Sequence, residues 1–61
     1  MNTHTIAAVD ILPGDIVLHE GNPLTVTELG SGRGVVEITG ILNGQTVTVS
    51  YPGIMYPVAL A

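Results

Sequence analysis

Side chains that could carry out acid–base or nucleophilic chemistry are few in this sequence. It has one Arg, two His, five carboxylates and no Cys. His19 and Glu20 are neighbours in a run that favours a strand, where consecutive side chains point to opposite faces, so we do not expect them to act as a pair. Ser31 and Ser50 have no spacing to a His and an acid that is typical of a nucleophilic triad. We therefore predict that the protein is not an enzyme and has no catalytic residues.

Metal and cofactor binding are also disfavoured by the residue types. Structural zinc sites use Cys and His ligands, and without Cys only His4, His19 and scattered carboxylates remain. A phosphate-binding loop needs a Lys followed by Ser or Thr and then a helix, whereas the glycine-rich segment 30–34 leads into a Val-rich run. The sequence predicts no metal site and no cofactor.

Arg33 is the only basic side chain, and it lies within the segment 30–34 between glycines. The formal net charge is -4, whereas nucleic-acid binding relies on Lys and Arg to neutralise phosphates. This composition disfavours a nucleic-acid partner. We interpret the segment as a flexible hairpin loop whose lone guanidinium can bind a carboxylate of a protein partner in bidentate fashion.

The length of 61 residues allows one small domain, which buries too little surface to be more than marginally stable by itself. Hydrophobic residues make up 46% of the chain and charged residues 10%. Soluble domains are usually about a quarter charged. We expect a subunit whose surface is partly covered by neighbouring protein chains, either in a homo-oligomer or in a larger assembly. The alternative is a monomer with a Thr-coated surface.

No membrane segment is predicted. The longest uncharged stretch, 38–61, is interrupted by Gly, Asn and Pro and lacks the roughly 20 apolar residues of a spanning helix. The N-terminus lacks the positive charge and long apolar core of a secretory signal. Together with the absence of Cys, this favours synthesis in the cytoplasm.

Turn residues recur at regular intervals and separate runs rich in Val, Ile, Thr and Leu, which favour strands. The clearest run is 46–51, and the run before it alternates from Val36 to Leu42. Asn43-Gly44 joins the two runs and suits a tight type I′ hairpin. Val47, Val49 and Tyr51 are expected to face inward, with the intervening Thr and Ser residues facing outward.

A second hairpin is predicted between 15–20 and 24–29, with its turn at 21–23. The range 54–60 is expected to form a fifth strand, which Pro57 confines to a sheet edge or a bulge. Five short strands at this spacing favour an all-β fold, a small SH3-like barrel that closes on itself. We assign residues 10–61 to this barrel and residues 1–9 to an N-terminal arm.

The C-terminal segment 51–61 is the strongest candidate for a protein interface. It is uncharged and contains both Tyr residues and the only Met after the first residue, and interface cores are enriched in aromatic residues and Met. The alternative is a last strand that only closes the barrel. The predicted interface residues are Arg33, Tyr51, Ile54, Met55, Tyr56 and Val58.

The ranges 10–29 and 42–47, with their turn residues and alternating strands, resemble the N-terminal KOW-like domain of bacterial elongation factor P and its eukaryotic relative. The resemblance covers about fifty residues and implies an SH3-like barrel. It also implies that the glycine-rich segment lies near the family's loop, whose tip carries a modified basic residue that reaches into the ribosome. The family's loop is longer and richer in basic residues than the segment 30–34, and the resemblance concerns the first domain of that family.

The function predicted from these features is a non-catalytic structural or assembly subunit that acts through protein–protein contacts. By analogy of size and style, it is similar to accessory or capsid decoration proteins of phage virions. One alternative is a nucleic-acid or ribosome-associated KOW-like module. Another is a small acidic inhibitor that occupies a basic site on an enzyme.

Overall fold

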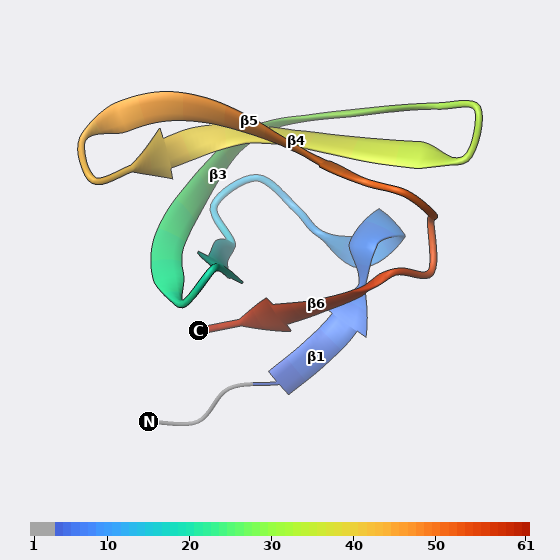
Figure 1. Ribbon diagram of the computed structural model, residues 1–61, viewed down its shortest axis with the longest axis horizontal. Helices are drawn as coiled ribbons and strands as arrows, with labels where there is room; N and C mark the ends of the chain where they lie inside the picture. The colour runs from blue at the N-terminus through green and yellow to red at the C-terminus, as the bar shows by residue number, and fades with distance from the viewer. Residues whose placement is uncertain (1–3) are drawn as a thin grey trace.

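The computed structural model describes residues 4–61, which form a single six-stranded antiparallel sheet with one short 3₁₀ turn (Figure 1). The strands lie in the order β1-β6-β2-β3-β4-β5, so β1 and β5 are its edges. The elements are β1 (His4–Ala7), η1 (Ala8–Asp10), β2 (Ile16–His19), β3 (Asn22–Gly32), β4 (Val35–Leu42), β5 (Gln45–Tyr51) and β6 (Pro57–Leu60).

The β4–β5 hairpin forms as the sequence predicts. Leu42 pairs with Gln45, and the two residues between them, Asn43 and Gly44, have φ values of 52° and 80°. Two positive φ values define the type I′ turn, whose twist matches that of the flanking strands. The inward-facing side chains of β5 are buried or half-buried and its Thr and Ser side chains are exposed, which confirms the predicted faces.

The β2–β3 hairpin also forms, but its turn lies earlier than predicted. His19 pairs with Asn22, so the turn residues are Glu20 and Gly21, with φ values of 51° and 81°. Pro23 is therefore inside β3 and pairs with Leu18. A Glu in the left-handed region is uncommon, which is why its sequence does not mark it as a turn residue.

Strand β3 is long and bent by a β-bulge. The register with β4 shifts between Val26 and Glu28, which leaves Thr27 without a partner in the ladder. The Thr27 hydroxyl donates instead to the Thr39 carbonyl oxygen at 3.1 Å. Bulges bend a strand and increase its twist. The N-terminal half of β3 packs on the core, whereas residues 27–34 are all exposed.

The prediction of five strands and a nine-residue arm is wrong in one respect. His4–Ala7, expected in the arm, form β1 and pair with β6 along the whole strand. This pairing joins the two ends of the chain, and four residues with little alternation carry no local signal for it. Residues 1–3 of the predicted arm lie outside the described residues.

The last strand is shorter than predicted and is not at an edge. Strand β6 begins at Pro57, and Ile54 and Met55 lie in a turn before it. It lies between β1 and β2 in the sheet order. Pro57 is tolerated there because the first residue of a strand can lack a ladder hydrogen bond.

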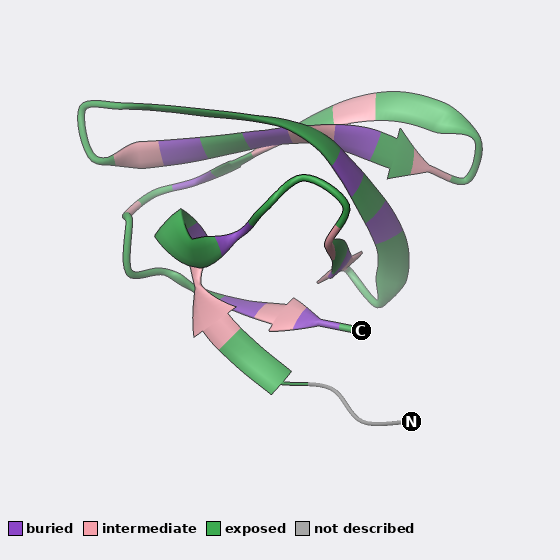
Figure 2. Cartoon of the chain, turned by 180° about the vertical axis from the view of Figure 1, so that it is seen from behind, coloured by how far each residue is buried: buried purple, intermediate pink, exposed green. Residues whose placement is uncertain are grey.

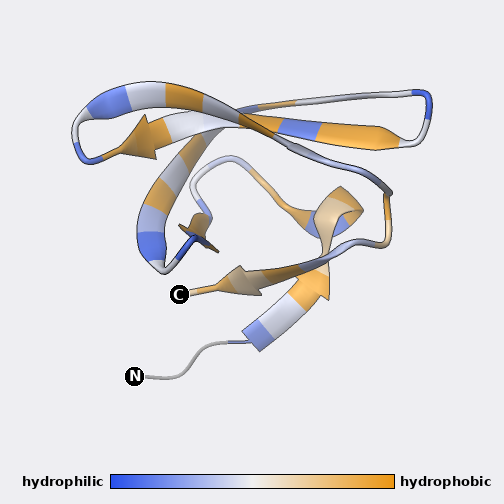
Figure 3. Ribbon diagram, in the orientation of Figure 1, coloured by the Kyte–Doolittle hydropathy of each residue, from blue (hydrophilic) through white to orange (hydrophobic). Residues whose placement is uncertain are grey.

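The core is formed by side chains from η1, the loop after it and every strand except β1, as the alternating buried positions of Figure 2 show. Val17, Leu24 and Ile38 are completely buried. Apolar residues also extend outside the core, on η1, on β4 and between β5 and β6 (Figure 3). Within residues 4–61, no helix has the length and hydropathy needed to span a membrane.

Candidate functional site

Arg33 lies at the tip of the β3–β4 hairpin. Gly32 pairs with Val35, so the turn consists of Arg33 and Gly34, with φ values of 54° and 78°. The segment is therefore not the flexible glycine loop predicted from the sequence, since Gly30 and Gly32 are paired within β3. Arg33 is exposed, and the β3–β4 turn that carries it lies at the periphery of the molecule in Figure 1.

All three tight hairpins share one turn design. Glu20, Arg33 and Asn43 each adopt a φ of 51° to 54° and each precedes a Gly with positive φ. A side chain other than Gly, Asn or Asp in this region costs roughly 1–2 kcal/mol. The turn chemistry therefore does not itself favour Arg at position 33, where Asn would fit the same backbone better.

The connection between β5 and β6 presents three consecutive exposed apolar side chains. The exposed fractions of Ile54, Met55 and Tyr56 are 47%, 71% and 45%. The connection is held from behind by two backbone hydrogen bonds, from the Ala8 amide to the Tyr56 carbonyl at 2.9 Å and from the Val9 amide to the Ile54 carbonyl at 3.0 Å. The apolar side chains are thus displayed on a fixed backbone.

Two of the predicted interface residues belong to the core. Tyr51 ends β5 with an exposed fraction of 8%, and Val58 in β6 has 3%. Their side chains pack with the buried residues of the sheet. The surface part of the predicted interface consists of Arg33 at the hairpin tip and Ile54, Met55 and Tyr56 in the connection.

Tyr51 links the core to the surface connection because its ring stacks on that of Tyr56, with centroids 5.5 Å apart and planes inclined by 28°. Burial, and secondly the neighbouring Tyr56, raise the pKa of the Tyr51 phenol. A proton on Tyr51 is thereby retained at alkaline pH, and the group is poorly suited to act as a base at neutral pH.

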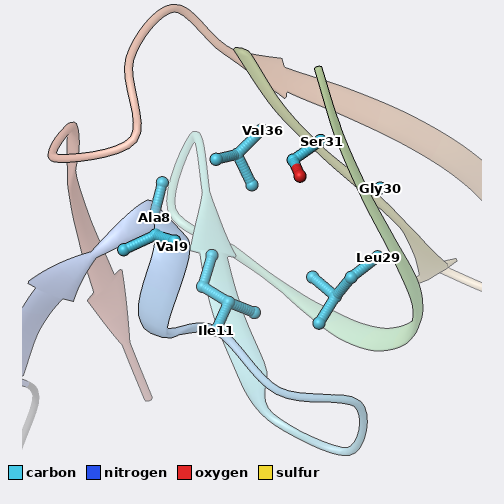
Figure 4. A pocket seen from close by; sticks show the side chains of 7 residues that line it. All are labelled: Ala8, Val9, Ile11, Leu29, Gly30, Ser31 and Val36. Carbon is cyan, nitrogen blue, oxygen red and sulfur yellow. The ribbon is translucent and has the colours of Figure 1, made fainter. Parts of the chain in front are cut away.

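The surface of the described residues includes two shallow hollows. The first, of about 230 Å³, lies between η1 and the base of the β3–β4 hairpin (Figure 4). Its lining is mainly apolar, with Ser31 as the only hydroxyl. The second, of about 450 Å³, is a groove between the end of β5, the end of β2 and β6. Its lining includes His19, Glu20, Ser50 and the Tyr51–Tyr56 pair.

The carboxylates that accept side-chain or backbone hydrogen bonds, Asp15 and Glu37, lie outside both hollows. Asp15 is used structurally, because its carboxylate accepts a hydrogen bond from the Leu12 amide at 2.8 Å and closes the turn before β2. Ser50 donates to the Glu37 carboxylate at 3.4 Å on the outer face of the sheet. Across residues 4–61, no three His, Asp or Glu side chains form a group that could hold a metal ion.

Two further exposed apolar residues lie near the N-terminus: Val9, which belongs to the apolar run 6–9 of the predicted arm, and Leu12, which sequence reasoning did not single out. Val9 and Leu12 have exposed fractions of 52% and 64%. Val9 lines the first hollow opposite Leu29 and is hydrogen-bonded to Ile54, so it connects the hairpin base to the β5–β6 connection.

No protein-family model matches the chain, and no curated protein is similar enough in sequence to match. Among solved structures, the fold is similar to that of a translation initiation factor eIF-5A family protein from Naegleria fowleri, with a TM-score of 0.81 and 20% sequence identity. The match covers 98% of this chain and 47% of that protein, so the chain spans about half of its length. The likeness establishes the fold and supports the resemblance seen in the sequence.

Proposed function

We propose that this chain is a non-catalytic KOW-like module associated with translation, and that it contacts its partner through the tip of the β3–β4 hairpin. The observation that supports the proposal most strongly is the likeness of nearly the whole chain to part of a protein described as a translation initiation factor. Function inferred from fold is an analogy, so the proposal also depends on the features of the hairpin itself.

The hairpin has the form of a contact element. The bulge at Thr27 separates the part of β3 that packs on the core from the exposed part that carries the tip. The turn has only two residues, so Arg33 is presented on a short, defined backbone. A single guanidinium with five donors can hold a carboxylate or a phosphate in bidentate fashion.

The net charge determines what kind of contact this is. With a formal charge of -4, the chain cannot neutralise many phosphates at once, as extended nucleic-acid binding requires. We therefore propose a local contact in which Arg33 reaches one acidic group and the rest of the surface contributes shape and apolar area. The acidic group belongs either to a protein or to RNA of the translation machinery.

The finer architecture is part of the proposal. We infer that the curved sheet acts as an SH3-like barrel whose two ends, β1 with β6 and β4 with β5, enclose the common core. The groove between β5 and β6 is where this barrel is open.

Co-sedimentation with ribosomes from the organism that encodes the chain tests the proposal. Arg33→Asn removes the charge but suits the positive φ of the turn, so the hairpin is retained. Arg33→Asn loses the hydrogen bond to the charged group of the partner, so we expect it to bind ribosomes at least about tenfold more weakly. Arg33→Lys, which keeps the positive charge, should restore part of this binding. Glu20→Asn is the matched control, because it changes the same turn position in another hairpin. Equal binding by the wild type and Arg33→Asn would contradict the proposal.

A second candidate is an assembly subunit that docks on another protein through the β5–β6 connection. The exposed Ile54, Met55 and Tyr56 favour it, because side chains of this kind are enriched in interface cores. A role in a virion is one form of this candidate and has no structural feature of its own in its favour.

A further inference from the structure

Strand β5 (Gln45–Tyr51) is an open edge of the sheet, bordered on one side by β4 only. Within residues 4–61, no backbone hydrogen bond from another segment reaches its outer side. The opposite edge, β1, is only four residues long, whereas β5 has seven. A long open edge is a template for another strand.

The alternation of hydrogen-bonded pairs along the β4–β5 ladder identifies the residues of β5 whose backbone N–H and C=O groups point away from β4. Leu42 and Gln45 flank a two-residue turn and therefore form a hydrogen-bonded pair, and such pairs alternate along an antiparallel ladder. Thr48 then lies opposite Thr39 in a non-hydrogen-bonded pair, consistent with the 3.1 Å contact between their hydroxyl oxygens. The N–H and C=O groups that point away from β4 are those of Thr46, Thr48 and Ser50.

The edge lacks the usual features that prevent strand addition. Soluble proteins protect edges with charged side chains, Pro or bulges. The sequence of β5 has no charged residue and no Pro, and its register with β4 is regular throughout. Its Thr and Val residues are strong strand formers. The outer backbone groups of β5 are therefore accessible for pairing with another strand.

The strand is also complementary to itself. When two copies are placed antiparallel with Thr48 at the centre, Thr48 faces Thr48, Thr46 faces Ser50 and Val47 faces Val49. All outward N–H and C=O groups then bond in register, giving about six backbone hydrogen bonds. Hydroxyl side chains meet on the outer face and Val side chains on the inner face, both favourable cross-strand pairs.

We propose that the β5 edge pairs with the β5 edge of a second copy of this chain, around a twofold axis at Thr48. The absence of charge on β5 removes like-charge repulsion at the contact, although each copy is acidic overall. The groove beside residues Val49 to Tyr51 leaves room for the partner strand at one end. A contact made mainly by one pair of strands is small, so the dimer forms in a concentration-dependent manner.

Single-cysteine variants test the register, because the chain has no Cys. In the proposed dimer, the two copies of residue 48 have Cα atoms about 5.5 Å apart, within disulfide range. The two copies of residue 46 have Cα atoms about 14 Å apart, as do the two copies of residue 50. Under mild oxidation, Thr48→Cys is expected to form a disulfide dimer at least about tenfold faster than Thr46→Cys or Ser50→Cys alone. A mixture of the latter two variants should cross-link to each other.

Equal cross-linking rates for the three single variants would overturn the proposal. Sedimentation equilibrium provides a measurement that does not depend on disulfide geometry. The wild type should approach the mass of two copies as its concentration rises, and Thr48→Lys should remain monomeric because two like charges meet at the axis. Thr25→Lys is the control, since Thr25 is exposed but lies on β3 between two paired strands. A monomeric wild type at millimolar concentration, or dimerisation of Thr48→Lys, would overturn the proposal.

Discussion

The ring of Tyr56 stacks on the ring of Tyr51, with centroids 5.5 Å apart. Tyr51 belongs to the core, whereas Tyr56 is 45% exposed. The stack therefore fixes the β5–β6 connection to the end of β5 and holds Ile54 and Met55 on the surface between them. A surface segment that lacks regular secondary structure is positioned by one aromatic contact and two backbone hydrogen bonds.

Removing the stack should destabilise the fold modestly. Aromatic pairs contribute about 0.5–1.5 kcal/mol beyond the area that they bury. Tyr56→Ala is expected to lower the free energy of unfolding by at least this amount, as measured by urea denaturation. Met55→Ala is the control, because Met55 is 71% exposed, and it should change stability by no more than about 0.5 kcal/mol. Equal effects of the two substitutions would show that the stack is energetically unimportant.

The raised pKa of Tyr51 predicts a loss of stability at alkaline pH. Burial, and then the nearby Tyr56, keep the Tyr51 phenol protonated in the folded state above its ordinary pKa of 10.0. Above that pH the unfolded chain binds fewer protons than the folded chain, so the free energy of unfolding falls as pH rises. The stabilisation that protonated Tyr51 contributes to the folded state is fully present below pH 10, the ordinary pKa of Tyr. It is lost as pH rises through the raised pKa of Tyr51 in the folded state. Denaturation measured between pH 8 and about pH 11.5 should show a shallower decline for Tyr51→Phe. Identical profiles would refute this assignment.

Gly40 is required by the close approach of β3 and β4 beside the bulge. A Cβ atom at this position would collide with the Thr25 carbonyl oxygen and the Leu24 side chain. Gly40→Ala is expected to cost about 1–3 kcal/mol, the usual cost of overpacking, as measured by thermal or urea denaturation. Gly53→Ala is the matched control, because a Cβ there meets nothing within 4 Å. A neutral effect of Gly40→Ala would mean that the two strands separate easily.

Local turn chemistry and alternation were sufficient to predict the β4–β5 hairpin and its faces. Asn43-Gly44 fits a two-residue turn so well that the register follows from it. The same reasoning placed a hairpin loop over 30–34 but did not locate the two-residue turn at Arg33-Gly34, because an Arg in the left-handed region has no sequence signal. It also extended the last strand to Ile54, since apolar alternation looks the same in a strand and in an exposed connection.

The pairing of strands that are distant in the sequence could not be predicted from local patterns. Strand β1 exists because His4–Ala7 meet Pro57–Leu60, which are separated from them by almost the whole chain. The position of β6 between β1 and β2 depends on the same contact. Among the predicted interface residues, Arg33 and Met55 are exposed. The inward position of Tyr51 follows from the alternation of β5, whereas the burial of Val58 depends on packing that no local pattern reports.

The central claim, that the hairpin tip contacts the translation machinery, is tested most directly by NMR of the ¹⁵N-labelled chain with substoichiometric ribosomes. The amide signals of Gly32, Arg33 and Gly34 are expected to lose intensity first, and Arg33→Asn should abolish this loss. Signals of residues 54–56 that broaden first would instead favour docking through the β5–β6 connection. Signals that stay unchanged throughout the chain would contradict the claim.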